Sequence, residues 1–129
     1  MTPDELKERT KQFALRILKV ADAMPRSVSG KILANQFGRS GTAVAANYRA
    51  ACKARSHAEF IAKIGIVEEE ADETMYWLDL AADYGVTPRQ RLQPLIDEAD
   101  ELTAIFGASR KTARSRSNRK SEIGNRQSP

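Results

Sequence analysis

Three short segments of this sequence carry the pattern of a helix start, and they constrain the fold more than any other feature. They are Thr2-Pro3-Asp4-Glu5, Ser56-His57-Ala58-Glu59 and Thr87-Pro88-Arg89-Gln90. In each segment a hydroxyl side chain can cap the first turn, and a Glu or Gln three residues later can reach back to the capping residue. In two of them a proline follows the cap, at the first helical position, which needs no backbone N–H. Each segment therefore predicts the beginning of a helix.

Apolar residues recur at helical spacing between these signals. Four helices are expected, from Pro3 to Met24, from Ser27 or Ser29 to about Arg55, from His57 to Tyr84, and from Pro88 to Phe106. The glycines at positions 85 and 107 are expected to end the last two helices, because glycine suits a helix C-terminus. Few runs alternate apolar and polar residues, and neither Asn-Gly nor Asp-Gly occurs. Short connections make consecutive helices antiparallel, so residues 1–107 are predicted to form an all-α, antiparallel up-down-up-down four-helix bundle.

Positive charge is concentrated at the C-terminal end of the chain. The 129 residues include 21 Lys or Arg and 17 Asp or Glu, a net charge of +4. Seven of the basic residues but only one of the acidic residues lie beyond Gly107. This segment is rich in Ser and Arg and has almost no apolar residues, so it cannot bury enough surface to offset the entropy of ordering. We expect residues 108–129 to be a disordered basic tail.

The side chains that metal sites and many catalytic sites use are scarce. The chain has one histidine, His57, and one cysteine, Cys52. A di-iron bundle needs Glu-x-x-His pairs from two helices, and a closed zinc site needs several Cys or His ligands. A P-loop, a dinucleotide fingerprint and a nucleophile elbow are all missing from the sequence. We therefore expect no metal, no cofactor and no enzymatic activity.

Two features bear on the compartment. The longest apolar runs are only a few residues, far short of the roughly 18 that suggest a membrane span, and the N-terminus lacks the pattern of a secretory signal. A single cysteine cannot form an internal disulfide, in agreement with a reducing environment. A cytoplasmic protein without a membrane partner is expected.

The segment Gly38-Arg39-Ser40-Gly41 has two interpretations. A Gly-x-x-Gly with a basic residue inside is the pattern with which KH domains hold a nucleic-acid backbone, but KH domains need strands. Within a helical pattern, two small residues three apart more often let another helix approach closely, at a propensity cost of about 1 kcal/mol per glycine. We favour the packing role, and with it a structural role for Arg39.

Charges of opposite sign separate onto the two middle helices. Residues 24–58 contain six basic residues and no acid, whereas residues 59–83 contain eight acids and one base. The basic and acidic faces can pair with each other within or between subunits. Alternatively, the basic residues can contact the phosphates of a nucleic acid, and such contacts need no motif that reads the bases. An acidic partner is the other occupant of such a surface. The residues predicted to bind nucleic acid are Arg49, Lys53 and Arg55, together with Arg110, Lys111, Arg114, Arg116, Arg119 and Lys120 of the tail.

The third helix carries more apolar surface than one buried face needs, since a stripe a little over 100° wide suffices for a bundle core. Its additional residues include Tyr76, Trp77, Leu80 and Tyr84. Trp77 and Tyr84 can complete the core of the monomer. Alternatively, all four form a surface for self-association, as exposed aromatic patches often do. We adopt the second interpretation as the predicted oligomer interface.

Two stretches together carry the pattern of a known family. The first is Gln36-Phe37-Gly38-Arg39-Ser40-Gly41-Thr42-Ala43-Val44-Ala45-Ala46-Asn47-Tyr48-Arg49-Ala50-Ala51. The second comprises Ser56, Glu59-Phe60, Lys63, Glu69-Glu70-Ala71, Glu73-Thr74 and Tyr76-Trp77-Leu78. With these, roughly residues 6 to 106 resemble the small bacterial four-helix-bundle proteins of 23S rRNA intervening sequences.

The resemblance implies a homopentamer of antiparallel bundles with no established catalytic activity. Related proteins include the accessory protein of diversity-generating retroelements, whose pentamer binds a reverse transcriptase and nucleic acid through basic surface. The leading hypothesis is therefore a non-enzymatic oligomeric scaffold that binds RNA, DNA or a ribonucleoprotein partner such as a reverse transcriptase. The alternative is a purely structural or protein-binding oligomer whose tail only aids solubility.

Overall fold

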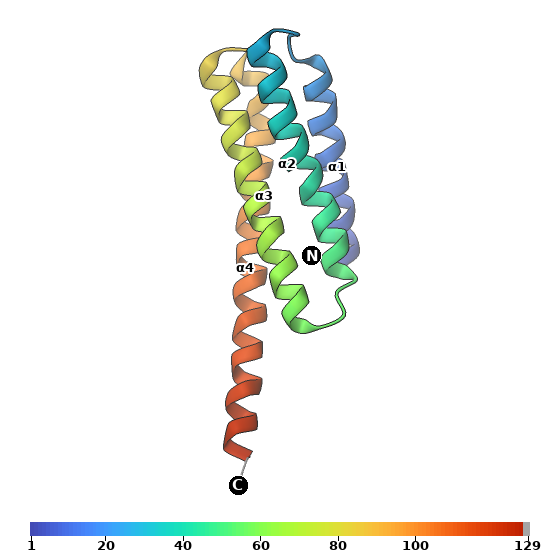
Figure 1. Ribbon diagram of the computed structural model, residues 1–129, viewed down its shortest axis with the longest axis vertical. Helices are drawn as coiled ribbons and strands as arrows, with labels where there is room; N and C mark the ends of the chain where they lie inside the picture. Colours follow the sequence, from blue (N-terminus) through green and yellow to red (C-terminus); the bar gives the residue numbers. More distant parts are fainter. Residues whose placement is uncertain (128–129) are drawn as a thin grey trace.

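The computed structural model describes residues 1–127, with side chains through residue 119. It contains four helices, α1 (Pro3–Ala23), α2 (Val28–Cys52), α3 (His57–Tyr84) and α4 (Arg89–Gln127). Consecutive helices are antiparallel and joined by short connections (Figure 1). No strand occurs within residues 1–127. The predicted all-α, up-down-up-down four-helix bundle is confirmed.

Two of the three predicted start signals form the expected hydroxyl cap, whereas at the third α4 begins at Arg89 and the described residues show no hydrogen bond of the Thr87 hydroxyl. At α1 the Thr2 hydroxyl accepts from the Glu5 N–H at 3.1 Å, and the Glu5 carboxylate accepts from the Thr2 N–H at 3.2 Å. At α3 the Ser56 hydroxyl accepts from the Glu59 N–H at 3.0 Å, but the Glu59 carboxylate accepts from the N–H one residue before the cap, that of Arg55. Each bond satisfies a backbone N–H that a helix N-terminus otherwise leaves without a partner.

The core is a single apolar cluster with contributions from all four helices. Its largest fully buried side chains include Phe13 of α1, Phe37 of α2 and Phe106 of α4. The rings of Tyr48 and Phe106 lie with centroids 5.1 Å apart, which links α2 to α4 across the bundle. Burial of each phenylalanine side chain contributes about 2 to 3 kcal/mol. The core therefore holds the four helices in one rigid frame.

Helix α4 continues past Gly107, so the prediction that it ends there is wrong. The predicted disorder from residue 108 is also wrong for residues 108–119, where Ala113 is only 5% exposed and its carbonyl lies 2.8 Å from His57 Nε2. The physical reason is length matching: α3 has 28 residues, and an antiparallel partner that starts at Arg89 needs the same length to cover it. Positions 128 and 129 lie outside the described residues.

Gly107 has a packing role instead of a terminating one. A Cβ atom at this position would lie 2.7 Å from Glu68 Oε2 of α3. The other carboxylate oxygen of Glu68 accepts from Arg110 Nε at 2.8 Å. The missing side chain thus makes room for the carboxylate that ties α4 to α3 one turn further on.

The close approach predicted at Gly38 and Gly41 of α2 is confirmed at one of them. A Cβ at Gly41 would lie 2.9 Å from both γ-carbons of Ile17, so α1 and α2 meet closely there. A Cβ at Gly38 would meet nothing within 4 Å. Of these two glycines, Gly41 is the one that the packing of α1 on α2 requires.

Candidate nucleic-acid interface

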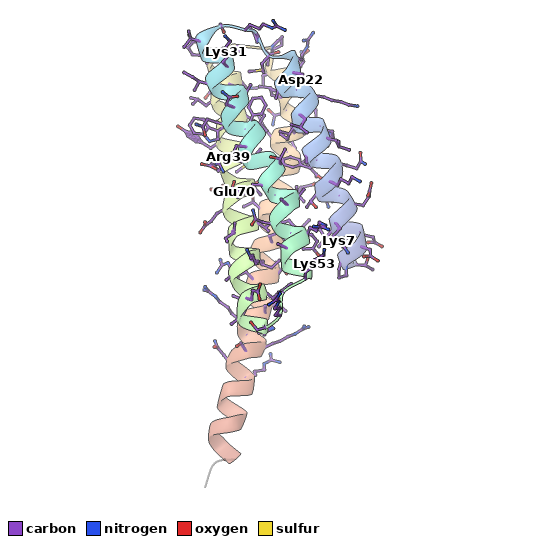
Figure 2. All side chains as sticks on the ribbon, turned by 45° about the vertical axis from the view of Figure 1, so that its right-hand side comes forward. Lys7, Asp22, Lys31, Arg39, Lys53 and Glu70 are labelled. Atoms are coloured by element: carbon purple, nitrogen blue, oxygen red, sulfur yellow. The ribbon has the colours of Figure 1, made fainter. Side chains whose placement is uncertain are left out.

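Basic side chains from several elements gather at one end of the bundle. The start of α1, the end of α2 and the α2–α3 connection lie at the end from which α4 projects (Figure 1). Figure 2 shows Lys7 and Lys53 at this end, and Asp22 and Lys31 at the opposite end. We call the following set the basic end: Lys7, Lys11, Arg49, Lys53, Arg55, Lys111, Arg114, Arg116 and Arg119.

A groove between α1 and α2 contains the first part of the basic end. It measures about 510 Å³, and Thr42, Ala45 and Ala46 contribute its lining from α2. Arg49 faces Lys7 and Lys11 across it. Asp4 and Glu8 also line the groove, and Asp4 pairs with Lys7 at 3.2 Å. Such an exposed pair contributes at most about 1 kcal/mol, so it can be exchanged for a phosphate contact.

Lys7 and Lys11 of α1 were not among the residues predicted from the sequence to bind nucleic acid. A signal was nevertheless present, because antiparallel packing must place the first turns of α1 beside the last turns of α2. A basic residue near the start of α1, on the side of the helix that faces α2, was therefore expected to lie near Arg49, whereas Arg9 faces α4 and pairs with Glu98.

The tail arginines and lysines occupy different surroundings along α4. Lys111, Arg116 and Arg119 line one groove, whereas Arg114 lines another that α4 shares with α3. Arg110 is different, because the hydrogen bond to Glu68 raises its pKa and fixes its side chain on α3. We therefore assign Arg110 to the fold instead of the interface. Lys120 belongs to α4, and its side chain lies outside the described part.

The three residues at the end of α2 that were predicted to bind nucleic acid are exposed and make no ion pair with a described side chain. Arg49, Lys53 and Arg55 are exposed, and within residues 1–119 no ion pair involves their side chains. At the opposite end, by contrast, Arg89 pairs with Asp79 at 3.0 Å and with Asp83 at 2.6 Å. Arg49, Lys53 and Arg55 therefore present positive charge to the solvent at this end, as Arg26 and Lys31 do at the opposite end.

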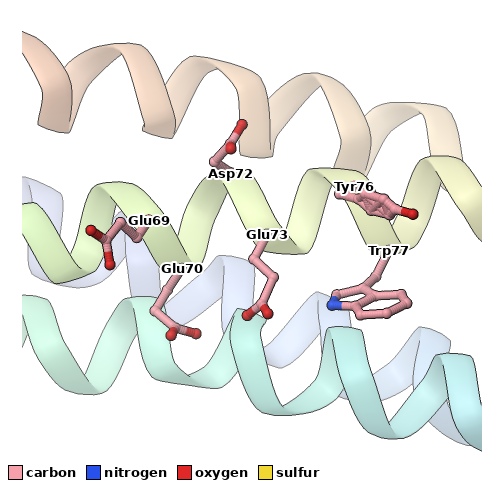
Figure 3. Close-up of a pocket in the computed structure, with 6 residues that line it drawn as sticks. All are labelled: Glu69, Glu70, Asp72, Glu73, Tyr76 and Trp77. Atoms are coloured by element: carbon pink, nitrogen blue, oxygen red, sulfur yellow. The ribbon is translucent and has the colours of Figure 1, made fainter.

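The opposite charges of α2 and α3 pair at one position. Arg39 donates to Glu70 at 3.1 Å and also to Glu73, which confirms its structural role. Glu69, Asp72 and the same two glutamates line a groove of about 590 Å³ with Tyr76 and Trp77 (Figure 3). Acidic and aromatic side chains thus share the outer surface of α3.

The four predicted interface residues divide into two groups. Tyr76 is 55% exposed, Leu80 38% and Tyr84 69%, and we call these three the aromatic strip. Trp77 is instead half-buried against the core, with its ring 5.2 Å from that of Tyr76 in an edge-to-face arrangement. Its buried indole N–H has no partner among the described residues. Trp77 therefore serves the monomer core in part, which agrees with the alternative weighed for it.

The described residues show neither a metal-binding cluster nor a membrane-spanning helix. Within the described part of the chain, no group of three or more His, Cys, Asp or Glu side chains is placed to hold a metal ion. None of the helices in that same part is both long and apolar enough for a membrane span.

The fold and these surfaces define a small helical-bundle protein with one basic end and one acidic, aromatic face. The chain belongs to the family of 23S rRNA-intervening sequence proteins, whose family model matches residues 5–108. A crystal structure of a protein with unknown function from the S23 ribosomal protein family of Bacteroides thetaiotaomicron superposes with a TM-score of 0.79 at 30% identity. The match covers 86% of this chain and 99% of that one. No curated protein matches.

Proposed function

We propose that the chain is a non-enzymatic, homo-oligomeric helical scaffold that binds nucleic acid, or a ribonucleoprotein partner, through its basic end. The observation that supports this most is the convergence of cations from α1, α2, the α2–α3 connection and α4 on one end of the molecule. Phosphate contacts need only exposed Lys and Arg side chains, which release condensed counterions when they bind. The binding we propose is therefore electrostatic and independent of base sequence.

The aromatic strip is the surface that we propose for self-association. Three exposed apolar or aromatic side chains at successive turns of one helix are the kind of residues that are enriched in the centres of interfaces. The family resemblance suggests five subunits. Several copies would display several basic ends together, and linked weak sites raise the overall affinity without any new contact.

Filter binding with RNA and with DNA at two salt concentrations tests the nucleic-acid part. Arg49→Gln combined with Lys53→Gln should weaken binding strongly at low salt, because two phosphate contacts are removed. Arg26→Gln combined with Lys31→Gln is the matched control, since it removes the same charge from the opposite end. Equal loss in both double variants would show that only net charge matters. Undetectable binding of the native chain, even at low salt, would refute nucleic-acid binding and leave the structural-oligomer alternative.

Sedimentation tests the self-association part. Tyr76→Lys combined with Leu80→Lys places two charges on the aromatic strip without disturbing the core, so it should yield smaller particles with unchanged helicity. Val28→Lys is the control, because Val28 is 78% exposed on α2 and lies outside the strip. Particles of native size in the double variant would show that the strip does not hold the oligomer together.

A further inference from the structure

A second exposed apolar surface lies on α1. Leu15 is 42% exposed and Leu18 is 46% exposed, and we call these two residues the α1 patch. They lie three residues apart, on one side of the helix. Lys11 and Lys19, one turn before and one turn after Leu15, are exposed, whereas the acid Asp22 lies one turn beyond Leu18. Within residues 1–119 neither lysine takes part in an ion pair. The α1 patch therefore combines apolar surface with unpaired cations.

The aromatic strip is bordered by the opposite charge. Four carboxylates line the groove beside it, and Arg39 pairs with two of them. The other two, those of Glu69 and Asp72, are exposed and form no ion pair with a side chain of residues 1–119. Like charges brought together across an interface are unfavourable, whereas complementary charges select the partner. The strip therefore suits a surface that supplies apolar side chains together with cations.

One apolar side chain of α2 extends the aromatic strip. Arg39 of α2 donates to Glu73 of α3. Ile32 lies seven residues before Arg39, and Leu80 lies seven residues after Glu73, so each is about two turns further along the same side of its helix. Because α2 and α3 are antiparallel, both steps lead toward the same end of the bundle (Figure 1). Ile32, which is 54% exposed, therefore belongs to the same face as the strip.

The α1 patch and the aromatic strip lie on different faces but in the same half of the bundle. Helices α1 and α3 do not pack against each other, so one copy cannot cover its own strip with its own patch. The two helices are parallel, and both surfaces fall in the second halves of their helices, away from the basic end (Figure 1). A rotation about an axis parallel to the helices shifts nothing along the bundle. Such a rotation can therefore bring the strip of one copy onto the α1 patch of another.

We propose that the aromatic strip of one copy packs on the α1 patch of a second copy. This inference rests on the proposed self-association and names the surface that receives the strip. Because the two surfaces differ, each pair of copies keeps one free strip and one free patch, and further copies add until a ring closes. All basic ends then lie on one side of the ring, where they can bind one nucleic acid together.

Sedimentation of the full chain tests the α1 patch. Leu15→Glu combined with Leu18→Glu places two acids opposite the acidic border of the strip, so it should reduce the particles to monomers with unchanged helicity. Ala104→Glu combined with Ala108→Glu is the matched control, because it adds two acids on an exposed side of α4 and should keep the native size. Native size in the Leu15 and Leu18 variant, or equal dissociation in the control, would overturn the inference.

Mixing two defective variants tests which surfaces meet. Tyr76→Glu combined with Leu80→Glu removes the strip and keeps the α1 patch, whereas the Leu15 and Leu18 variant does the reverse. Each should be monomeric alone, but an equimolar mixture should form a mixed dimer, because one intact strip meets one intact patch and the other two surfaces both carry acids. A contact between two strips predicts only monomers in this mixture. Monomers in the mixture, at concentrations at which the native chain is fully assembled, would overturn the inference.

The native chain serves to distinguish failure of this inference from failure of the proposed self-association. A native chain that sediments as a monomer overturns both. A native oligomer that dissociates in the strip variant but keeps its size in the Leu15 and Leu18 variant overturns only the pairing of the strip with α1.

Discussion

Alanine substitution at Gly38 and at Gly41 of α2 should change stability in opposite directions. Gly38 and Gly41 lie three residues apart in the same helix, and both gain the same backbone benefit from alanine, about 1 kcal/mol of helix propensity. Their surroundings differ. The new methyl group meets nothing within 4 Å at position 38, but it lies 2.9 Å from two carbon atoms of Ile17 at position 41.

The expected size of the difference follows from this geometry. Ile17 is fully buried and β-branched, so it cannot turn aside, and forcing a methyl group into such a site costs typically 1 to 3 kcal/mol. The propensity gain cancels when the two variants are compared with each other. Gly41→Ala should therefore be about 1 to 3 kcal/mol less stable than Gly38→Ala. Gly38→Ala itself should be up to about 1 kcal/mol more stable than the native chain.

Urea unfolding followed by circular dichroism measures both free energies. All samples need the same protein concentration, because self-association makes apparent stability depend on it. Combining Gly41→Ala with Ile17→Ala should cost less than the sum of the two changes, since the new methyl group partly fills the cavity left by the isoleucine. Equal stability of the Gly38 and Gly41 variants, or strict additivity in the double variant, would refute the close contact between α1 and α2.

Three further predictions concern α4. Arg110→Gln breaks the ion pair with Glu68 of α3 and should lower the free energy of unfolding slightly, with faster amide exchange in residues 111–119, measured by mass spectrometry. Truncation after residue 116 should leave the melting temperature nearly unchanged, whereas truncation after residue 107 should lower the free energy of unfolding by about 2 kcal/mol through lost burial. Equal effects of the two truncations would contradict the conclusion that α4 must match the length of α3. The hydrogen bond from Arg9 lowers the pKa of Glu98 in the folded protein. The ionised carboxylate therefore adds stability at pH values above its unfolded pKa of about 4.3, and this contribution is lost as the pH falls through the folded pKa. Glu98→Gln should therefore lower the melting temperature at about pH 7 but not at about pH 2, where the native chain has lost the same contribution.

The helix starts could be predicted because their signals are local. The side chains that cap α1 and α3 bond to backbone groups within four residues, so the sequence pattern contains both partners. Gly85 was likewise predictable as a helix end. It adopts a left-handed φ of 84°, and the N–H groups of Gly85 and Val86 return to the carbonyl of Ala81.

The end of α4 could not be predicted from Gly107, because a glycine that ends a helix and one that makes room for a neighbour look identical in sequence. The deciding fact is the position of Glu68 on another helix, 39 residues earlier in the chain. The same non-local contact removes Arg110 from the candidate site. The length of α3, which was predictable, would have indicated that its partner continues to about residue 116.

The candidate site was predicted in composition but not in arrangement. The excess of basic residues in α2 and the C-terminal segment was visible in the sequence. Their convergence with Lys7 and Lys11 of α1 depends on helix packing, and so does the pairing of Arg39 with acids of α3. Surface charges constrain folding only weakly, so the hydrophobic periodicity and the capping signals do not predict where these charges lie relative to one another.

The salt dependence of nucleic-acid affinity is the measurement that tests phosphate binding by the basic end most directly. For the native chain, log K should fall linearly and steeply as log[salt] rises. In Arg49→Gln combined with Lys53→Gln, the slope should be smaller by about 2, whereas the Arg26 and Lys31 control should keep the native slope. A native slope in the Arg49 and Lys53 variant, or an equal decrease in both variants, would contradict the assignment of phosphate contacts to this end of the bundle.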